Sequence, residues 1–434
     1  MSKILSKFKL ASTAVLISSI AGASSSLAAN YYQVIDLGTL EGNTSEAFAV
    51  NDNNSVVGVS NGTGFISHAY VYRDTTQELV DLGHLDFANA IESGRSAAFG
   101  IVGNTAVGYS KKNAQVGVDS EGNAIISEVD FGVYFDIGSL TINEIPQFNT
   151  EAATDTNAVA INESQLIVGT TKVDPPDDTN SAGEPLTLFY ERGYIYDINT
   201  QEYFIIEPIQ PTQLNQFVVM RDINDSGIAV GISSVLVNER NELNILLVNA
   251  SAPTSVEAVN IFGGQANYAW AINNSGFVVG KATLEGSLTE QAFLYDSETK
   301  VVTELGYLNE SFKASEAIDI NESNQIVGRS RFQNSPAVFH AFLYEDGEMK
   351  DLNKLIACDS GWVLNEARGI NDAPGGAVIV GSGVINGEKH AFMLKPLEGT
   401  APSCEVEEEK SGSGSLPFIS LVGLLLLGFR RARV

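Results

Sequence analysis

A recurring Asn–Gly motif constrains this chain more than any other feature of its sequence. It reads Ala-x-x-(Ile/Val)-Asn, four or five turn residues and Val-Val-Gly, followed by a variable loop, (His)-Ala-Phe-Leu-Tyr and Asp-Leu-Gly. The asparagine copies are Asn51, Asn162, Asn224, Asn273, Asn321 and Asn371, and the glycine copies are Gly58, Gly169, Gly231, Gly280, Gly328 and Gly381. A degenerate copy over residues 98–108 lacks the asparagine, so seven units recur about 48 to 62 residues apart.

Each unit predicts four short strands. In the first half, a run such as Glu46-Ala-Phe-Ala-Val50 precedes an Asn-rich turn, although its two-residue alternation is imperfect. In the second half, His340-Ala-Phe-Leu-Tyr344, a turn and Met349-Lys-Asp-Leu352 make another antiparallel pair. Four strands per unit predict an all-β fold, a seven-bladed β-propeller of four-stranded blades over residues 29–397. A string of separate β-sandwiches is the alternative architecture.

The last unit lacks its own Asp-Leu-Gly strand. After residues 390–394 the chain continues into Lys-Pro and an acidic stretch. The missing element stands near the other end, where residues 31–38 match residues 79–83 of the first unit. We therefore expect residues 31–37 to form the outer strand of the last blade, beside residues 389–395, which would protect exposed blade edges.

The N-terminal residues have the pattern of a secretory signal. Lys3, Lys7 and Lys9 precede an apolar run over residues 10–20, and small residues at Ser26 and Ala28 suit a cleavage site. Residues 1–28 are therefore predicted to be a signal peptide, with an uncleaved anchor as the alternative.

The C-terminal residues predict a sorting tail. An acidic and then Ser/Gly-rich linker over 398–415 leads to an apolar segment, 416–429, and a cluster of arginines closes residues 416–434. The apolar segment is shorter than the ~20 residues that a spanning helix needs. We expect a transient hold in the inner membrane followed by cleavage by a processing protease. The chain would then be exported to the periplasm, outer surface or medium of a Gram-negative bacterium.

The motifs resemble those of a known family. The elements His68-Ala-Tyr70, His340-Ala-Phe342 and His390-Ala-Phe392, with Asp36-Leu-Gly38, resemble the HAF family of extracellular repeat proteins. That resemblance implies export and a repeat fold, and no established activity. The tail resembles the GlyGly-CTERM sorting signal, which implies trimming by a rhomboid-type protease, although alternating Ser and Gly replace the Gly-Gly doublet.

The charge of the chain limits its partners. It has 25 Lys and Arg against 53 Asp and Glu, and without the six basic residues of the two terminal segments 19 remain against 53. Such a chain repels phosphate backbones, which excludes nucleic acid as a partner. An unknown protein or glycan ligand, divalent cations and a surface adapted to salt remain open.

Several residue clusters suggest chemistry, and each has a plainer explanation. Gly58-Val-Ser60-Asn-Gly62 matches a nucleophile elbow but lacks its strand–turn–helix context, and equivalent serines recur at Ser110, Ser233 and Ser330. His68, His340 and His390 occupy one repeat position and therefore belong to different blades. Asp174, Asp177 and Asp178 are weak calcium candidates without the spacing of a calcium loop. Cys358 and Cys404 predict one disulfide in an oxidising compartment.

These observations favour an exported binding or structural module of unknown ligand. The alternatives are a secreted propeller hydrolase or lyase acting on polysaccharide and a calcium-dependent adhesin. No catalytic or cofactor-binding residue is assigned. An enzyme would need buried, converging carboxylates from several blades, whereas a mouth lined by dispersed Asn, Ser and Asp would favour the module.

Overall fold

The computed structural model describes residues 31–61, 66–85, 94–119, 121–148, 153–173, 190–210 and 216–397. Within these ranges the fold is all-β, and the only helical segment is the 3-10 turn η1 (Leu352–Lys354). No helix of the described part is long and apolar enough to cross a membrane. The predicted signal peptide, linker and sorting tail lie outside the described residues.

Three antiparallel four-stranded sheets follow one another from the first motif onward. The first contains β2 (Thr44–Val50), β3 (Ser55–Asn61), β4 (Ser67–Arg73) and β5 (Glu78–Gly83). The second contains β6 (Ser96–Val102), β7 (Thr105–Val118), β8 (Ala124–Asp136) and β9 (Thr141–Glu144). The third contains β10 (Thr156–Ile161), β11 (Leu166–Val173), β12 (Tyr190–Asp197) and β13 (Tyr203–Ile206).

The next eight strands form one sheet with a narrow joint. Its first part contains β14 (Val218–Ile223), β15 (Ile228–Val237), β16 (Arg240–Asn249) and β17 (Val256–Val259). Its second part contains β18 (Gly263–Ile272), β19 (Phe277–Leu284), β20 (Glu290–Asp296) and β21 (Val302–Gly306). The two parts are joined by a single parallel residue pair, Leu243 with Ala266.

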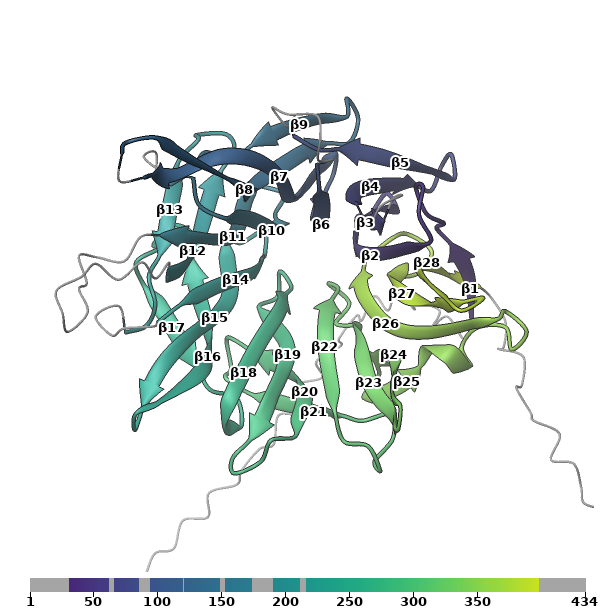
Figure 1. Cartoon of the computed structure of the whole chain (residues 1–434). Helices are drawn as coiled ribbons and strands as arrows, with labels where there is room; N and C mark the ends of the chain where they lie inside the picture. Colours follow the sequence, from purple (N-terminus) through teal and green to yellow (C-terminus); the bar gives the residue numbers. More distant parts are fainter. Residues whose placement is uncertain are drawn as a thin grey trace, which may run out of the picture. The chain divides into compact units, whose positions relative to one another are not determined.

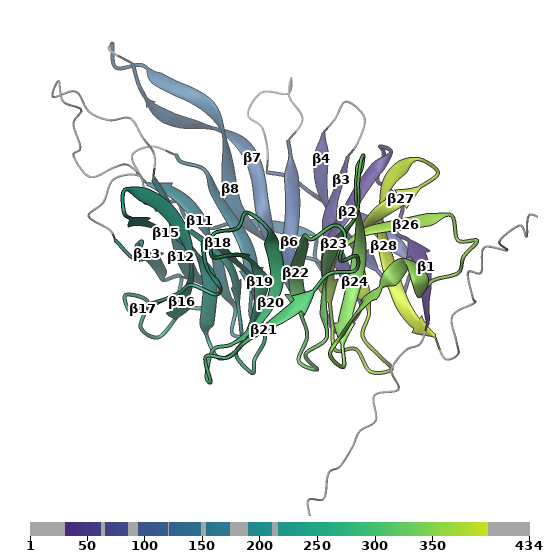
Figure 2. The same cartoon turned by 90° about the horizontal axis from the view of Figure 1, so that it is seen from below.

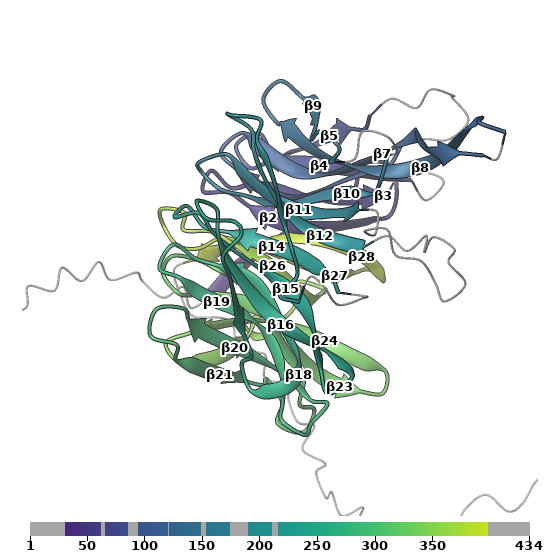
Figure 3. The same ribbon diagram turned by 90° about the vertical axis from the view of Figure 1, so that its left-hand side faces the viewer.

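Two further four-stranded sheets complete the described fold. One contains β22 (Ser315–Ile320), β23 (Ile326–Asn334), β24 (Ala337–Glu345) and β25 (Glu348–Asp351). The other contains β26 (Trp362–Ile370), β27 (Ile379–Ile385), β28 (Glu388–Leu397) and the N-terminal strand β1 (Tyr31–Asp36). Figure 1 shows the sheets succeeding one another, and Figures 2 and 3 show the long β7–β8 hairpin projecting beyond the other strands.

The N-terminal strand pairs with the last strand of the chain, as the sequence analysis expected. β1 runs antiparallel to β28, and Val34 lies opposite Leu394. β1 pairs with residues 392–397, which lie slightly later in the chain than the expected residues 389–395. The regular pairing ends at Asp36 and does not include Leu37. Its backbone N–H still donates to the Ala391 carbonyl at 3.1 Å.

The buried core lies between consecutive groups of four strands. Each of seven apolar clusters in the described part joins one group to the next. One of them packs Val380 and Met393, near the end of the chain, against Ala47 and Tyr70, near its beginning. The groups therefore form one closed ring of interfaces, and the alternative of separate sandwiches is wrong.

Candidate functional site: a polar cavity on the ring axis

Every inner strand carries one β-bulge at the same repeat position. The inner strands are β2, β6, β10, β14, β18, β22 and β26. In each, pairing with the next strand skips the residue that follows the repeat alanine, whose place is taken by Met220 in β14, and β18 and β26 each have one further irregularity. The unpaired residues are Phe48, Phe99, Val159, Arg221, Trp270, Ile318 and Arg368. A bulge re-aims the side chain of its extra residue. All seven residues line one cavity of about 620 Å³, which we call the arginine cavity.

The repeat glycine explains why the bulge recurs. A Cβ atom on Gly58 would collide with the carbonyl oxygen of Glu46 on the paired inner strand. The same clash would occur at Gly280 with Tyr268 and at Gly328 with Glu316. Only glycine permits this close approach of backbones, so the Val-Val-Gly motif maintains the bulge opposite it.

Arg221 is the most unusual residue of the arginine cavity. Its guanidinium lies 4.5 Å from the Trp270 ring centre, and it has no ion-pair or hydrogen-bond partner among the described residues. Burial lowers the pKa of Arg221, partly offset by the negative charges of Glu191 and Glu316. Arg221 is half-buried, its Nε atom is fully buried, and a cation placed in this way without a protein partner is available to an anionic ligand.

Further buried polar atoms of the cavity lack a partner in the described structure. They belong to lining residues from three different sheets, and the Nε atom of Arg221 is among them. They are Arg221 Nε, Trp270 Nε1, Arg368 Nε, Asn157 Oδ1 and Thr170 Oγ1. Buried polar groups in native proteins are almost always hydrogen-bonded, so this concentration indicates a surface that binds polar ligand atoms or water.

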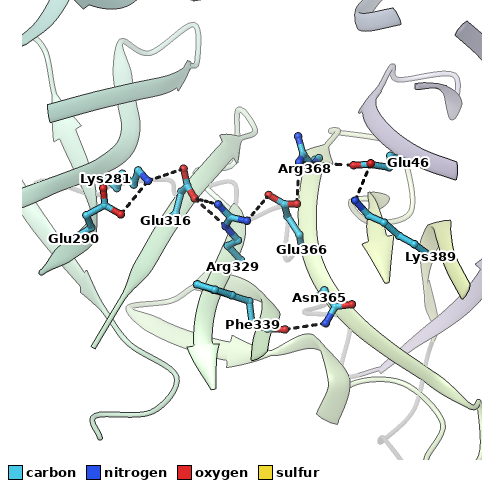
Figure 4. Close-up of polar contacts among 10 residues, drawn as sticks. All are labelled: Glu46, Lys281, Glu290, Glu316, Arg329, Phe339, Asn365, Glu366, Arg368 and Lys389. Atoms are coloured by element: carbon cyan, nitrogen blue, oxygen red, sulfur yellow. Dashed lines mark hydrogen bonds and ion pairs between the residues drawn. The ribbon is translucent and has the colours of Figure 1, made fainter. Parts of the chain in front are cut away.

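The second arginine of the lining, Arg368, belongs to an ion-pair belt, which Figure 4 draws. Its carboxylates Glu46, Glu316 and Glu366 stand two residues before a bulged residue, so we place the belt at the mouth of the cavity on that side of the bulges. Three ion pairs of the belt join different sheets, namely Lys281–Glu316 at 3.6 Å, Arg329–Glu366 at 3.6 Å and Lys389–Glu46 at 2.8 Å. Arg329–Glu316 at 2.8 Å and Arg368–Glu366 at 3.0 Å connect them within a sheet. Burial alone would lower the pKa of Arg329, but Glu316 and Glu366 hold it above its ordinary value. Arg368 also lies 5.1 Å from the Phe48 ring centre.

Two half-buried carboxyls, those of Asp222 and Asp319, line the same cavity. Burial raises the pKa of Asp222 to about 6 and that of Asp319 to about 8, and the negative charge of Asp222 contributes to the second shift. Each carboxyl accepts a backbone N–H from the inner strand of the next group, Ile272 at 2.8 Å and Ile370 at 2.9 Å. The other inner strands carry Ala or Gly at this position.

The repeat asparagines surround the opposite mouth, which we call the asparagine mouth. Each side-chain oxygen accepts a backbone N–H of its own turn, as from Ser55 to Asn51 at 2.9 Å. Each side-chain amide donates to a carbonyl of the next group. The donor–acceptor pairs are Asn162–Asn224, Asn224–Asn273, Asn273–Asn321, Asn321–Asn371, Asn371–Asn51 and Asn51–Gly103. The predicted turn asparagines therefore also link the sheets to one another.

The other predicted residues have structural surroundings. Ser60 is fully buried, and its hydroxyl accepts the Leu40 N–H at 2.9 Å. His68, His340 and His390 lie in different sheets, and each pairs with the Asp of the neighbouring Asp-Leu-Gly strand or its equivalent. Asp174, Asp177, Asp178 and Cys404 lie outside the described residues. The calcium candidates and the Cys358–Cys404 disulfide therefore stay predictions.

Sequence reasoning missed the arginine cavity. The available signal was the imperfect alternation of each inner strand, which marks the bulge. A second signal was the residue after the repeat alanine, which changes from aromatic to aliphatic to Arg between units.

Comparisons with known proteins give the fold and no specific activity. Residues 122–311 match the model of a protein family of unknown function, DUF3466. No curated protein matches. The fold is similar to that of an oligogalacturonate lyase in complex with manganese, with a TM-score of 0.51, 15% identity, and 85% of this chain and 94% of the other covered. A second similar structure is the β-propeller domain of the trilobed protease of Pyrococcus furiosus, with a TM-score of 0.45, 10% identity, and 86% and 96% covered. The chain therefore has a propeller-like fold, while the HAF and GlyGly-CTERM resemblances stay predictions.

Proposed function

We propose that this protein is a seven-bladed propeller that binds an anionic saccharide in the arginine cavity. The observation that carries the proposal is the half-buried Arg221, which lies on Trp270 and has no anionic partner in the described structure. The blade count follows if the eight-stranded sheet, joined through one residue pair, is read as two blades.

The chemistry of the lining favours an acidic sugar over other anions. Arginine binds a carboxylate through two parallel hydrogen bonds, and these charge-assisted bonds are the stronger kind. The aromatic rings of Phe48, Phe99 and Trp270 offer apolar surface, while Asn157 and Thr170 offer polar atoms for hydroxyl groups. A volume of about 620 Å³ is within the usual range of small-molecule sites, ~300–1,000 Å³.

Binding of trigalacturonate to the purified protein by titration calorimetry tests this proposal, with the neutral galactose trimer as the comparison ligand. We expect the acidic trimer to bind and Arg221→Gln to weaken its binding at least ~10-fold, which corresponds to ~1.4 kcal/mol. Arg240→Gln, at an exposed turn, is the matched control. Equal binding of both trimers, or equal loss in both variants, would refute the proposal.

A second candidate function is cleavage of the same saccharide. The favouring observation is that Asp222 and Asp319 share the cavity with two arginines and have raised pKa values, as acid–base groups often do. Release of new reducing ends from polygalacturonate, abolished by Asp319→Asn, would support it. Unchanged reducing ends after prolonged incubation would leave the protein a binding module.

The manganese of the similar lyase does not fit this cavity. Arg221 and Arg368 would repel a cation, and the carboxyl oxygens of Asp222 and Asp319 already accept backbone N–H groups. Among the described residues no group of three or more His, Cys, Asp or Glu could hold a metal ion. No metal-dependent step is therefore assigned.

We also propose that the protein works outside the cytoplasm, delivered by the predicted signal and sorting segments. The intact mass of protein isolated from the surface of its native host should lack residues 416–434. Surface-exposed protein that retains the full tail would contradict the processing step.

A further inference from the structure

We infer that the axial channel has one entrance for an anionic chain, so that the protein recognises the end of that chain and does not thread it. This inference rests on the proposed function and adds which part of the ligand is bound. The sequence order of the inner strands fixes the layers of the channel.

The seven inner strands each pass from a bulge to a repeat-turn residue in the same order. In β14, for example, Val219 occupies the position that the belt glutamates occupy in other inner strands. The bulged Arg221 comes two residues later, and Ile223, Asn224 and Asp225 follow it. At ~3.3 Å per residue, the acidic residue stands up to ~13 Å beyond the arginine along the chain. The ion-pair belt, the arginine cavity and the asparagine mouth therefore follow one another along the axis.

An aliphatic girdle separates the arginine cavity from the asparagine mouth. The β-branched residue before each repeat-turn position lines the asparagine mouth; these residues are Val50, Ile101, Ile161, Ile223, Ile272, Ile320 and Ile370. Val50, Ile101 and Ile161 also line the arginine cavity, so the two spaces adjoin at this girdle. A carboxylate passing the girdle would lose water and gain no hydrogen-bond partner, which is costly.

Beyond the girdle lies an acidic rim. Asp52, Glu163, Asp225, Glu322 and Asp372 line the asparagine mouth, and none of the residues lining it is basic. These carboxylates are held in place, because Asp225 accepts the Glu163 N–H at 2.9 Å and Asp372 accepts the Glu322 N–H at 2.8 Å. Partial burial raises the pKa of Glu322, and the charges of Asp372, Asp225 and Asp52 add to the shift.

The two mouths therefore differ in the charge that they present to a polyanion. The entrance with the ion-pair belt contains Lys281, Arg329, Arg368 and Lys389 among its carboxylates. The charged residues of the rim are all carboxylates, and they repel the same ligand. An acidic chain that enters past the belt can place its terminal sugar on Arg221 and must leave the remainder outside.

End-labelled trigalacturonate tests this inference. One trimer carries a bulky fluorophore at its reducing end and the other at its non-reducing end, and the binding of both is compared with that of the unlabelled trimer. We expect one label to be tolerated within about twofold and the other to weaken binding at least ~10-fold. The same asymmetry should persist in Glu322→Gln, because the girdle remains, and in the control Asp346→Asn at an exposed turn.

The outcomes separate the two proposals. Failure of the unlabelled trimer to bind would overturn the proposed function. If the unlabelled trimer binds and both labels are tolerated, or both abolish binding, end recognition is overturned while saccharide binding stands. Polygalacturonate that competes in proportion to its mass, and not to its concentration of ends, would also overturn end recognition.

Discussion

Asn371 links the last sheet to the first, and its removal should destabilise the whole ring. Its side chain is 4% exposed. The amide donates to the Asn51 carbonyl at 2.8 Å and to Asn54 Oδ1 at 2.9 Å, while its oxygen accepts the Val378 N–H at 2.8 Å. In Asn371→Ala the Val378 N–H loses its acceptor, at a cost of ~1–3 kcal/mol. The Asn51 carbonyl still accepts the Asn54 N–H, so its loss is smaller, ~0.5–1.5 kcal/mol.

We therefore expect Asn371→Ala to lower the free energy of unfolding by ~2–4 kcal/mol, measured by urea denaturation. Asn53→Ala is the matched control, because its exposed side chain lies in the neighbouring turn and makes no hydrogen bond to any described residue. Asn371→Asp separates the two roles of the residue. Aspartate suits such a turn as well as asparagine does but has no amide to donate, so we expect it to destabilise the protein at neutral pH.

The reasoning would be refuted if Asn371→Asp were as stable as the wild type, since the residue would then serve only its own turn. Equal destabilisation by Asn53→Ala and Asn371→Ala would refute it as well, because the loss would reflect turn composition and not the link between sheets.

Three further results are expected. Deleting residues 31–36 should expose the edge of β28 and remove the buried Tyr32, giving a lower thermal midpoint and more aggregation on light scattering; an unchanged midpoint would contradict ring closure. Because burial raises the pKa of Asp319 to about 8, the folded state binds more protons than the unfolded state between pH ~4 and ~8, so stability should fall as pH rises over that range and level off above it. Asp319→Asn should flatten this dependence in urea titrations, and a slope equal to that of the wild type would argue against it. Counting of thiols in denatured, unreduced protein should find none at Cys358 and Cys404, and two reactive thiols would exclude their disulfide.

The sequence predicted those parts of the fold that depend on local pairing. The Asn-turn hairpin appears as β2 and β3, where Val50 pairs with Val56 across the turn. The last unit lacks an outer strand, and residues 31–38 match the Asp-Leu-Gly strand that forms the outer strand in other units. This match predicted that β1 would pair with β28.

Contacts between units could not be predicted in the same way. The asparagine pattern indicates a local turn, and nothing in its spacing identifies the carbonyl that its amide meets about 50 residues away. The degenerate second unit shows why the acceptor could not be predicted. Val102 stands where the other units have asparagine, the turn is shorter, and the Asn51 amide donates to the carbonyl of Gly103. The Arg221–Trp270 contact was missed for a related reason, because the two residues come from different units and meet only across the bulges.

The bulge separates the residues that hold the ring from those that can recognise a ligand. Alanine, the bulge, glycine and asparagine recur because backbone approach and inter-sheet hydrogen bonds require them. The bulged residue is not paired with the next strand, so its side chain can be Phe, Val, Trp, Ile or Arg without disturbing strand pairing. In a fold built this way, ligand chemistry is set by the one position that the repeat leaves variable. That position places Arg221 and Trp270 on adjacent inner strands, where the half-buried guanidinium lies on the ring and has no anionic partner among the described residues.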